Sequence, residues 1–461
     1  MLQGRPQPLT SISLLLNWFG YTFTGTENPC PSKGPPLDTN VPLPSRSILL
    51  RNVCVVLSSV CVSRVISVNF HNTQNTPRVE RYLQKFKMNN YSEKFRTYIR
   101  EGEKAAMALP NRGPIQFESN GNVASEILEG YAKYGFYVLE NFLDKKELQD
   151  WQDDFDTMKA NYPETSEAKV DLYGRPALGV DAKGPALFWA KPLSDPLGGT
   201  KHSGGRYAVR MSEPLADESL PEEIVYMIMG PLRYSEALLR ITGHPHLLAI
   251  AEAIFGDDFV PFNEALWIKE AGLGSSTAWH QDGVTHWDHP QWDKDIHGMT
   301  FQVQLHGCSG ANGLWVLPGS HTHGKIDIKQ LIEEAGSDRI IGAVPYMCGP
   351  GDVVMHNRQL LHGSFANTSD KERVSLTFGF NRRSSILNVE AGLHNKNAVY
   401  DEARILERSR MIGYAIDARR QHFPDETSYD YKPLSGLNHK VVWSEAVKES
   451  LRNYNLLDLS I

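Results

Sequence analysis

One segment constrains the fold more than any other: residues 299–306 (MTFQVQLH) alternate strictly between apolar and polar side chains. A period of two is that of a β-strand with one face in an apolar core. The polar face must then meet water or a ligand. Shorter segments that also read as strands lie at 265–270, 313–317, 352–356 and 373–380. The sequence therefore predicts a mainly β core, an antiparallel barrel or jelly roll with a site at its mouth.

Helices are expected to flank this core. Before Gly256 the apolar residues follow helical spacing at 123–134, 144–158 and 232–255, with a short apolar strand at 135–140. Helical spacing returns near the C-terminus, at 404–416 and 441–451. Residues 161–210 are rich in glycine and proline, which predicts a long surface loop of the kind that often contributes to binding sites.

Composition excludes several classes of protein. With 41% hydrophobic and 22% charged residues in 461, the chain can bury a large core, so it is not disordered as a whole. A net charge of −7 argues against a nucleic-acid-binding protein, because phosphate contacts need clustered Lys and Arg. The five cysteines form no CxxC pair, which favours a reducing compartment and a cytoplasmic location.

Residues 1–87 differ from the rest of the chain. They carry nine basic and three acidic side chains, and their most apolar run, residues 52–63, is too short to span a membrane. This composition suits an organelle transit peptide. The alternative is a disordered leader or a mis-assigned start, with Met88 opening the folded protein. The folded domain is thus expected at 88–461, with its core at about 120–385 and a helical extension at 386–461.

Histidines are concentrated where the strands are predicted: nine of the sixteen lie between His280 and His362. In an extended chain His280 and Asp282 project to the same side, so both can reach one metal ion. With His362 they make two imidazoles and one carboxylate, the facial set of non-haem Fe(II) enzymes. Arg373, eleven residues after His362, can present a guanidinium fork to a carboxylate.

Other histidines compete with this interpretation. His356 is an alternative metal ligand. Three more histidines lie in the loop 283–298, which is either a substrate-contacting rim or an ordinary solvated loop: His286, His289 and His297.

Taken in order, the motifs resemble the phytanoyl-CoA dioxygenase family, over about residues 120–385. They are His280-Gln-Asp282, Asn312-Gly313, the LPGSH segment 317–321, Gly351-Asp352, His362-Gly-Ser364, Asn367 and Arg373. The resemblance implies a double-stranded β-helix, the jelly roll of cupin-like proteins, and an oxygenase that uses Fe(II), 2-oxoglutarate and O₂. It further implies that the metal ligands are His280, Asp282 and His362.

By the same resemblance, Arg373 and Ser364 hold the distal carboxylate of 2-oxoglutarate. Gln302 stands where the family often has an aromatic residue, so it either contacts 2-oxoglutarate or substrate or has a structural role. Lys269 is expected to be a surface lysine whose stem packs on the domain. Asp282 favours hydroxylation, or desaturation or demethylation, because related halogenases carry a small residue at that position.

The predicted function is hydroxylation of an unactivated C–H bond of a small organic metabolite, with release of succinate and CO₂. A net charge of −13 outside residues 1–87 favours a small metabolite over an acyl-CoA. Two alternatives remain open: a non-catalytic jelly-roll binding module, and a cupin-type dioxygenase that needs no 2-oxoglutarate. The sequence favours no particular oligomeric state.

Overall fold

The structure, a computed structural model, describes residues 93–201, 205–214, 219–262, 264–282, 298–390, 399–437 and 441–451. They lie within one compact unit, Arg81–Ile461. The expectations for residues 1–87 and for the histidines of the loop 283–297 fall outside the described residues. In the part that is described, no helix is both long and apolar enough to cross a membrane.

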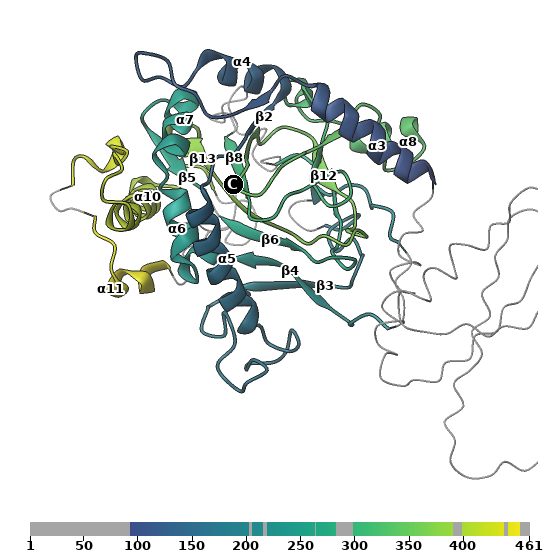
Figure 1. Cartoon of the computed structure of the whole chain (residues 1–461), viewed down its shortest axis with the longest axis horizontal. Coiled ribbons are helices and arrows are strands. Elements are labelled where there is room, and N and C mark those ends of the chain that lie inside the picture. Colours follow the sequence, from purple (N-terminus) through teal and green to yellow (C-terminus); the bar gives the residue numbers. More distant parts are fainter. Residues whose placement is uncertain are drawn as a thin grey trace, which may run out of the picture. The chain divides into compact units, whose positions relative to one another are not determined.

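Two sheets form the core (Figure 1). Among the described residues, the larger sheet has nine strands in the order β1-β2-β11-β8-β13-β6-β4-β3, and β5 pairs with β13. Its strands are β1 (Arg112–Gly113), β2 (Phe136–Leu139), β3 (Leu187–Ala190), β4 (Ile224–Met229), β5 (Phe259–Pro261), β6 (Ala265–Lys269), β8 (Met299–Gln304), β11 (Val353–Asn357) and β13 (Arg373–Arg382). All of its pairs are antiparallel except β1 with β2.

The smaller sheet has the order β10-β9-β12-β7 and is also antiparallel. Its strands are β7 (Thr277–His280), β9 (Trp315–Val316), β10 (Val344–Pro345) and β12 (His362–Ser364). Apolar residues from both sheets, among them Val354 of β11 and Val316 of β9, form one buried cluster. The two sheets therefore face each other, and the predicted jelly-roll core with flanking helices is confirmed.

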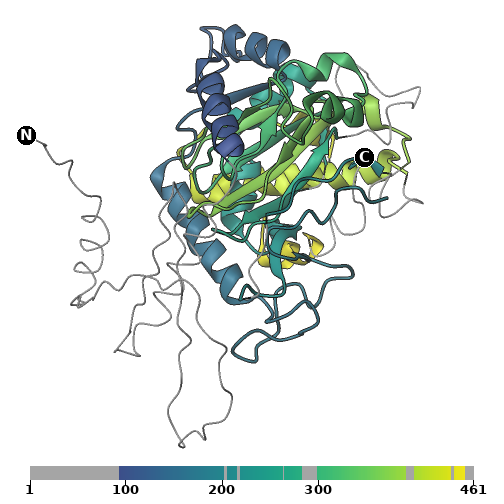
Figure 2. The same cartoon turned by 90° about the vertical axis from the view of Figure 1, so that its right-hand side faces the viewer.

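Helices flank both sheets. In the part of the chain that is described they are α3 (Glu93–Ala108), α4 (Ser125–Tyr134), α5 (Lys145–Ala160), α6 (Glu236–Thr242), α7 (Pro245–Phe255), α8 (Ile328–Ala335), α9 (Arg383–Ile386), α10 (Glu402–His422) and α11 (Glu445–Lys448). Short 3₁₀ turns lie at Pro231–Arg233, Ser320–His323, Lys432–Leu434 and Glu449–Leu451. Figures 1 and 2 show α5, α6, α7 and α10 on one side of the larger sheet, where they share a buried cluster with Phe301 and Leu376.

The alternating segment occupies a central position in the larger sheet, as β8 between β11 and β13. Met299, Phe301 and Val303 pack in the apolar cluster under the helices. The polar residues Thr300 and Gln302 are buried too, on the opposite face, which looks toward the smaller sheet. The polar face of this strand therefore lines the interior of the jelly roll.

Two expectations about the chain before β5 need correction. The predicted helix 232–255 is divided into α6 and α7. A side chain at Gly243 would come within 2.4 Å of the Ala415 backbone, and Pro245 begins the second helix. The segment 161–210 is not wholly a surface loop, because it contains β3 and the buried Tyr207.

A buried ion pair joins α10 to α5. Arg419 donates from Nη1 to Glu147 Oε1 at 2.6 Å and from Nη2 to Glu426 Oε1 at 2.7 Å. Its side chain is 5% exposed. Arg419→Ala should lower the free energy of unfolding by about 3–5 kcal/mol, because it leaves the buried Glu147 carboxylate without its partner. Denaturant titration measures this.

The neighbouring Arg420 is the matched control. It pairs with Asp417 in the same helix, but its side chain is 52% exposed. Arg420→Ala should cost about 1 kcal/mol or less. Equal losses of unfolding free energy in Arg419→Ala and Arg420→Ala would contradict the structural role given to Arg419.

Candidate functional site

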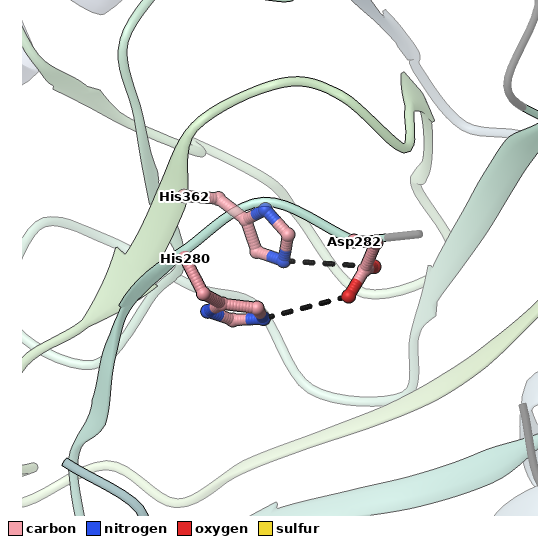
Figure 3. A group of neighbouring side chains, drawn as sticks. All are labelled: His280, Asp282 and His362. Carbon is pink, nitrogen blue, oxygen red and sulfur yellow. Dashed lines mark ion pairs between the residues drawn. The ribbon is translucent and has the colours of Figure 1, made fainter. Parts of the chain in front are cut away.

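Three predicted ligands come together between two adjacent strands of the smaller sheet. His280 ends β7, Asp282 follows two residues later, and His362 begins β12, where it is the register partner of His280. His280 Nε2 lies 3.6 Å from Asp282 Oδ1, and His362 Nε2 lies 3.9 Å from Asp282 Oδ2. Figure 3 shows the two rings turned toward the carboxylate. The three candidate ligand atoms all lie within 4.8 Å of one another, which suits one metal ion.

Backbone carbonyls orient the two rings. His280 Nδ1 lies 2.7 Å from the carbonyl oxygen of Ala278, and His362 Nδ1 lies 2.8 Å from that of Leu360. A carbonyl can only accept, so Nδ1 carries the proton and the Nε2 lone pair faces Asp282. Burial lowers the pKa of both histidines, so the rings are neutral, as metal ligands must be.

Asp282 is ionised. Burial by itself would raise its pKa, but the charge of Arg206 outweighs this, and the pKa lies below its usual range. The donor set is thus two neutral imidazoles and one carboxylate, which fits Fe(II).

Arg206 and Tyr207 contact two of these ligands and were not predicted. Arg206 Nη1 donates to Asp282 Oδ1 at 2.9 Å, and Nη2 donates to the Tyr207 hydroxyl at 2.9 Å. The Tyr207 ring lies 4.6 Å from that of His280. The segment is anchored by the buried Asp195, which accepts from the backbone N–H groups of Gly198 and Met211. No spacing in the sequence relates residues 206–207 to the His280 motif, 74 positions later in the chain.

A second group of buried polar residues comes from both sheets. Arg373 begins β13 and is buried, as is Ser364 at the end of β12. Arg373 Nε and Nη1 and Ser364 Oγ have no hydrogen-bond partner among the described residues. Buried donors without partners are rare in proteins. They fit an anionic ligand such as the distal carboxylate of 2-oxoglutarate.

Lys269 corrects one expectation. It is 4% exposed and therefore not a surface lysine. It lies opposite Arg373 in the β6–β13 register, and its Nζ donates to the carbonyl oxygen of Phe365. Burial, and next the charge of Arg373, lower its pKa well below the usual value. Two basic side chains therefore line the same buried end of the site.

Gln302 and His356 lie on two adjacent strands of the larger sheet, β8 and β11. Gln302 is buried on the inner face of β8, and its Oε1 accepts from Gln304 Nε2 at 3.3 Å. The ring of His356 lies 5.4 Å from that of His362. His356 is not a member of the described group whose ligand atoms lie within 4.8 Å, so the geometry favours His280, Asp282 and His362.

The family model for phytanoyl-CoA dioxygenase matches residues 206–375, which include all six residues predicted for the site. Residues 206–375 belong to the phytanoyl-CoA dioxygenase family. Over these residues the predicted family is confirmed, and together with the group of metal ligands it identifies a 2-oxoglutarate-dependent non-haem iron dioxygenase that uses Fe(II) and 2-oxoglutarate.

More distant similarities involve individual proteins. An L-proline trans-4-hydroxylase of Streptomyces griseoviridis is 24% identical over 201 residues, covering 37% of this chain and 75% of the relative. EctD of S. alaskensis, solved with 2-oxoglutarate and 5-hydroxyectoine, is 18% identical with a TM-score of 0.42, over 60% of this chain and 82% of that one. SnoK, a carbocyclase of nogalamycin biosynthesis, is 13% identical with a TM-score of 0.39, over 71% and 98%.

Proposed function

We propose that this phytanoyl-CoA dioxygenase family member hydroxylates an unactivated C–H bond of a small organic metabolite and converts 2-oxoglutarate to succinate and CO₂. One observation carries the proposal. The same jelly roll holds a facial set of two neutral histidines and an ionised aspartate, and a buried arginine two of whose nitrogens have no partner among the described residues.

In this proposal the residues have separate tasks. His280, Asp282 and His362 would hold Fe(II). Arg373 and Ser364 hold the distal carboxylate of 2-oxoglutarate, Lys269 lies opposite Arg373 in the strand register, and Gln302 lines the space between. The bound iron supplies the activation of O₂, which no side chain can provide. The surrounding protein keeps the site dry, since all of these residues except Asp282 are buried.

Two features favour hydroxylation over other outcomes. Asp282 occupies the position at which related halogenases have a small residue, so no ligand position is vacated for a halide. The Streptomyces griseoviridis relative is a hydroxylase of a free amino acid. A cupin-type dioxygenase without 2-oxoglutarate is disfavoured, because the buried Arg373 and Lys269 would then have no anion to bind.

The test is to incubate the full chain with Fe(II), 2-oxoglutarate, ascorbate and a panel of polar metabolites. Mass spectrometry should find a product that has gained one oxygen atom in an amount equal to the succinate formed. A product that has lost two hydrogens or gained a halogen would replace hydroxylation by desaturation or halogenation.

Arg206 gives a prediction about metal affinity. If it holds one oxygen of Asp282 so that the other faces the metal, Arg206→Met should weaken Fe(II) binding by about 10- to 100-fold, as is usual for partners of metal ligands. The measurement is anaerobic titration with Fe(II). Arg210→Met is the control, because Arg210 is exposed and pairs with Glu213. Wild-type affinity in Arg206→Met would rule out this role.

A further inference from the structure

Unpartnered polar side chains continue along the inner face of the larger sheet past the metal ligands. On β13 the residues of this face are Arg373, Ser375, Thr377, Gly379 and Asn381, because Val374, Leu376, Phe378 and Phe380 pack under the helices. At about 3.4 Å per residue, Arg373 and Asn381 are about 27 Å apart along the strand. 2-Oxoglutarate, a five-carbon diacid, would span only a small part of that length if it were bound at Arg373. The Asn381 end of the strand must therefore face another molecule or another part of the protein.

Three residues at this far end are buried without hydrogen-bond partners. They are Thr300 and His356, each 2% exposed, and Asn381, 1% exposed. The Thr300 hydroxyl, both ring nitrogens of His356 and both amide atoms of Asn381 lack a partner within the part of the chain that is described. Leaving such a buried group unsatisfied is destabilising. Five atoms in this state at one place are typical of a binding site rather than of a packed core.

The three residues lie together and beside the metal ligands. His356 of β11 and Gly379 of β13 are both register partners of Thr300. Asn381 lies two residues after Gly379, on the same face of β13. It is close to Gly298, because a Cβ atom added to this glycine would lie 2.1 Å from Asn381 Oδ1. The His356 ring is 5.4 Å from the ring of His362. A molecule bound here would therefore lie next to the metal, on the side away from Arg373.

We propose that Thr300, His356 and Asn381 form the substrate subsite, and that it takes a small polar metabolite carrying a carboxylate rather than a fatty acyl chain. This inference rests on the proposed function. The Thr300 hydroxyl and the Asn381 amide each offer a donor and an acceptor without a partner among the described residues, and a hydrocarbon chain can satisfy neither.

The carboxylate follows from Arg206. Its guanidinium contacts Asp282, and its buried Nε has no partner among the described residues. The Asp282 carboxylate that Arg206 contacts lies 3.9 Å from His362, whose ring is 5.4 Å from that of His356, so a positive charge borders the subsite. A guanidinium with an N–H group to spare is well suited to a substrate carboxylate.

The experiment uses the full chain with Fe(II) and 2-oxoglutarate, and it measures succinate formed above the rate without substrate. The probes are the twenty free amino acids, including L-proline, their amides, and palmitoyl-CoA. At least one free acid should stimulate succinate formation more than its amide does, and palmitoyl-CoA should not. Asn381→Leu should raise the constant for that acid by about 10-fold or more and leave the constant for 2-oxoglutarate within about twofold, since one lost hydrogen bond to a charged group is worth about 1.5–3 kcal/mol.

Three variants make the result specific. Asn381→Asp keeps the size of the side chain but adds negative charge, so it should weaken binding of the acid at least as much as Asn381→Leu. It replaces the leucine variant in the test if that variant does not fold. Ser375→Ala, two positions from Arg373, should change the constant for 2-oxoglutarate and not that for the acid. Asn111→Leu makes the same change at a buried asparagine that bonds the Phe136 carbonyl, and should affect stability alone.

The possible failures are distinguishable. The subsite would be overturned if palmitoyl-CoA alone stimulated succinate formation, or if no probe did. It would also be overturned if both Asn381 variants left the constant for the stimulating acid unchanged. If the wild-type chain consumes no 2-oxoglutarate with or without a probe, the proposed function itself is wrong.

Discussion

Replacing Arg373 by alanine should raise the apparent constant for 2-oxoglutarate by about 10²- to 10³-fold. The guanidinium is buried, and two of its nitrogens have no partner among the described residues, so we assign them to the distal carboxylate. Removing one member of a buried charge pair costs roughly 3–5 kcal/mol. At 1.4 kcal/mol per factor of ten, this free-energy cost corresponds to the predicted rise of about 10²- to 10³-fold in the apparent constant for 2-oxoglutarate. Succinate formation as a function of 2-oxoglutarate concentration measures it.

Three further measurements separate this role from a structural one. Fe(II) binding should survive in Arg373→Ala, because Arg373 is not a ligand. Arg373→Lys should recover only part of the affinity, since an ammonium group cannot reproduce the planar fork. Arg382→Ala, at the other end of β13, should leave the constant for 2-oxoglutarate unchanged. A stable, iron-loaded Arg373→Ala enzyme with normal 2-oxoglutarate dependence would refute the assignment.

Removal of either histidine ligand should have the second large effect. His280→Ala and His362→Ala each leave one imidazole and one carboxylate, so binding of one Fe(II) per chain and turnover of 2-oxoglutarate should both be abolished. Iron analysis after anaerobic loading measures the first, and succinate formation the second. His356→Gln is the matched control: it should keep its iron, because His356 lies outside the ligand group. Loss of iron in His356→Gln with retention in His280→Ala would reverse the assignment.

The sequence was most informative where periodicity or spacing encodes geometry. Strict alternation at 299–306 predicted β8 and its polar inner face, because a period of two has only one structural meaning in a strand. The His280–Asp282 spacing placed two ligands on one side of an extended chain. Helical spacing near 123–134 and 144–158 predicted α4 and α5 to within a few residues.

Contacts between distant segments could not be predicted. Lys269 looked like a surface residue because it precedes a glycine-containing turn. Only its register opposite Arg373 places it inside. Arg206 lies in a glycine-rich stretch without periodicity, and a buried carboxylate, Asp195, positions it against Asp282. Strand β4 (Ile224–Met229) is buried throughout, so it shows no alternation and was missed.

The most direct test of the metal site follows iron, 2-oxoglutarate and succinate in the same samples of the full chain. The wild-type enzyme should hold one Fe(II) and form one succinate for each 2-oxoglutarate consumed, lose this activity with a chelator, and regain it when Fe(II) is added. His362→Ala should hold no iron and form no succinate while keeping a wild-type unfolding temperature. Wild-type succinate formation by the His362→Ala chain would contradict the assignment of His280, Asp282 and His362 as the iron site.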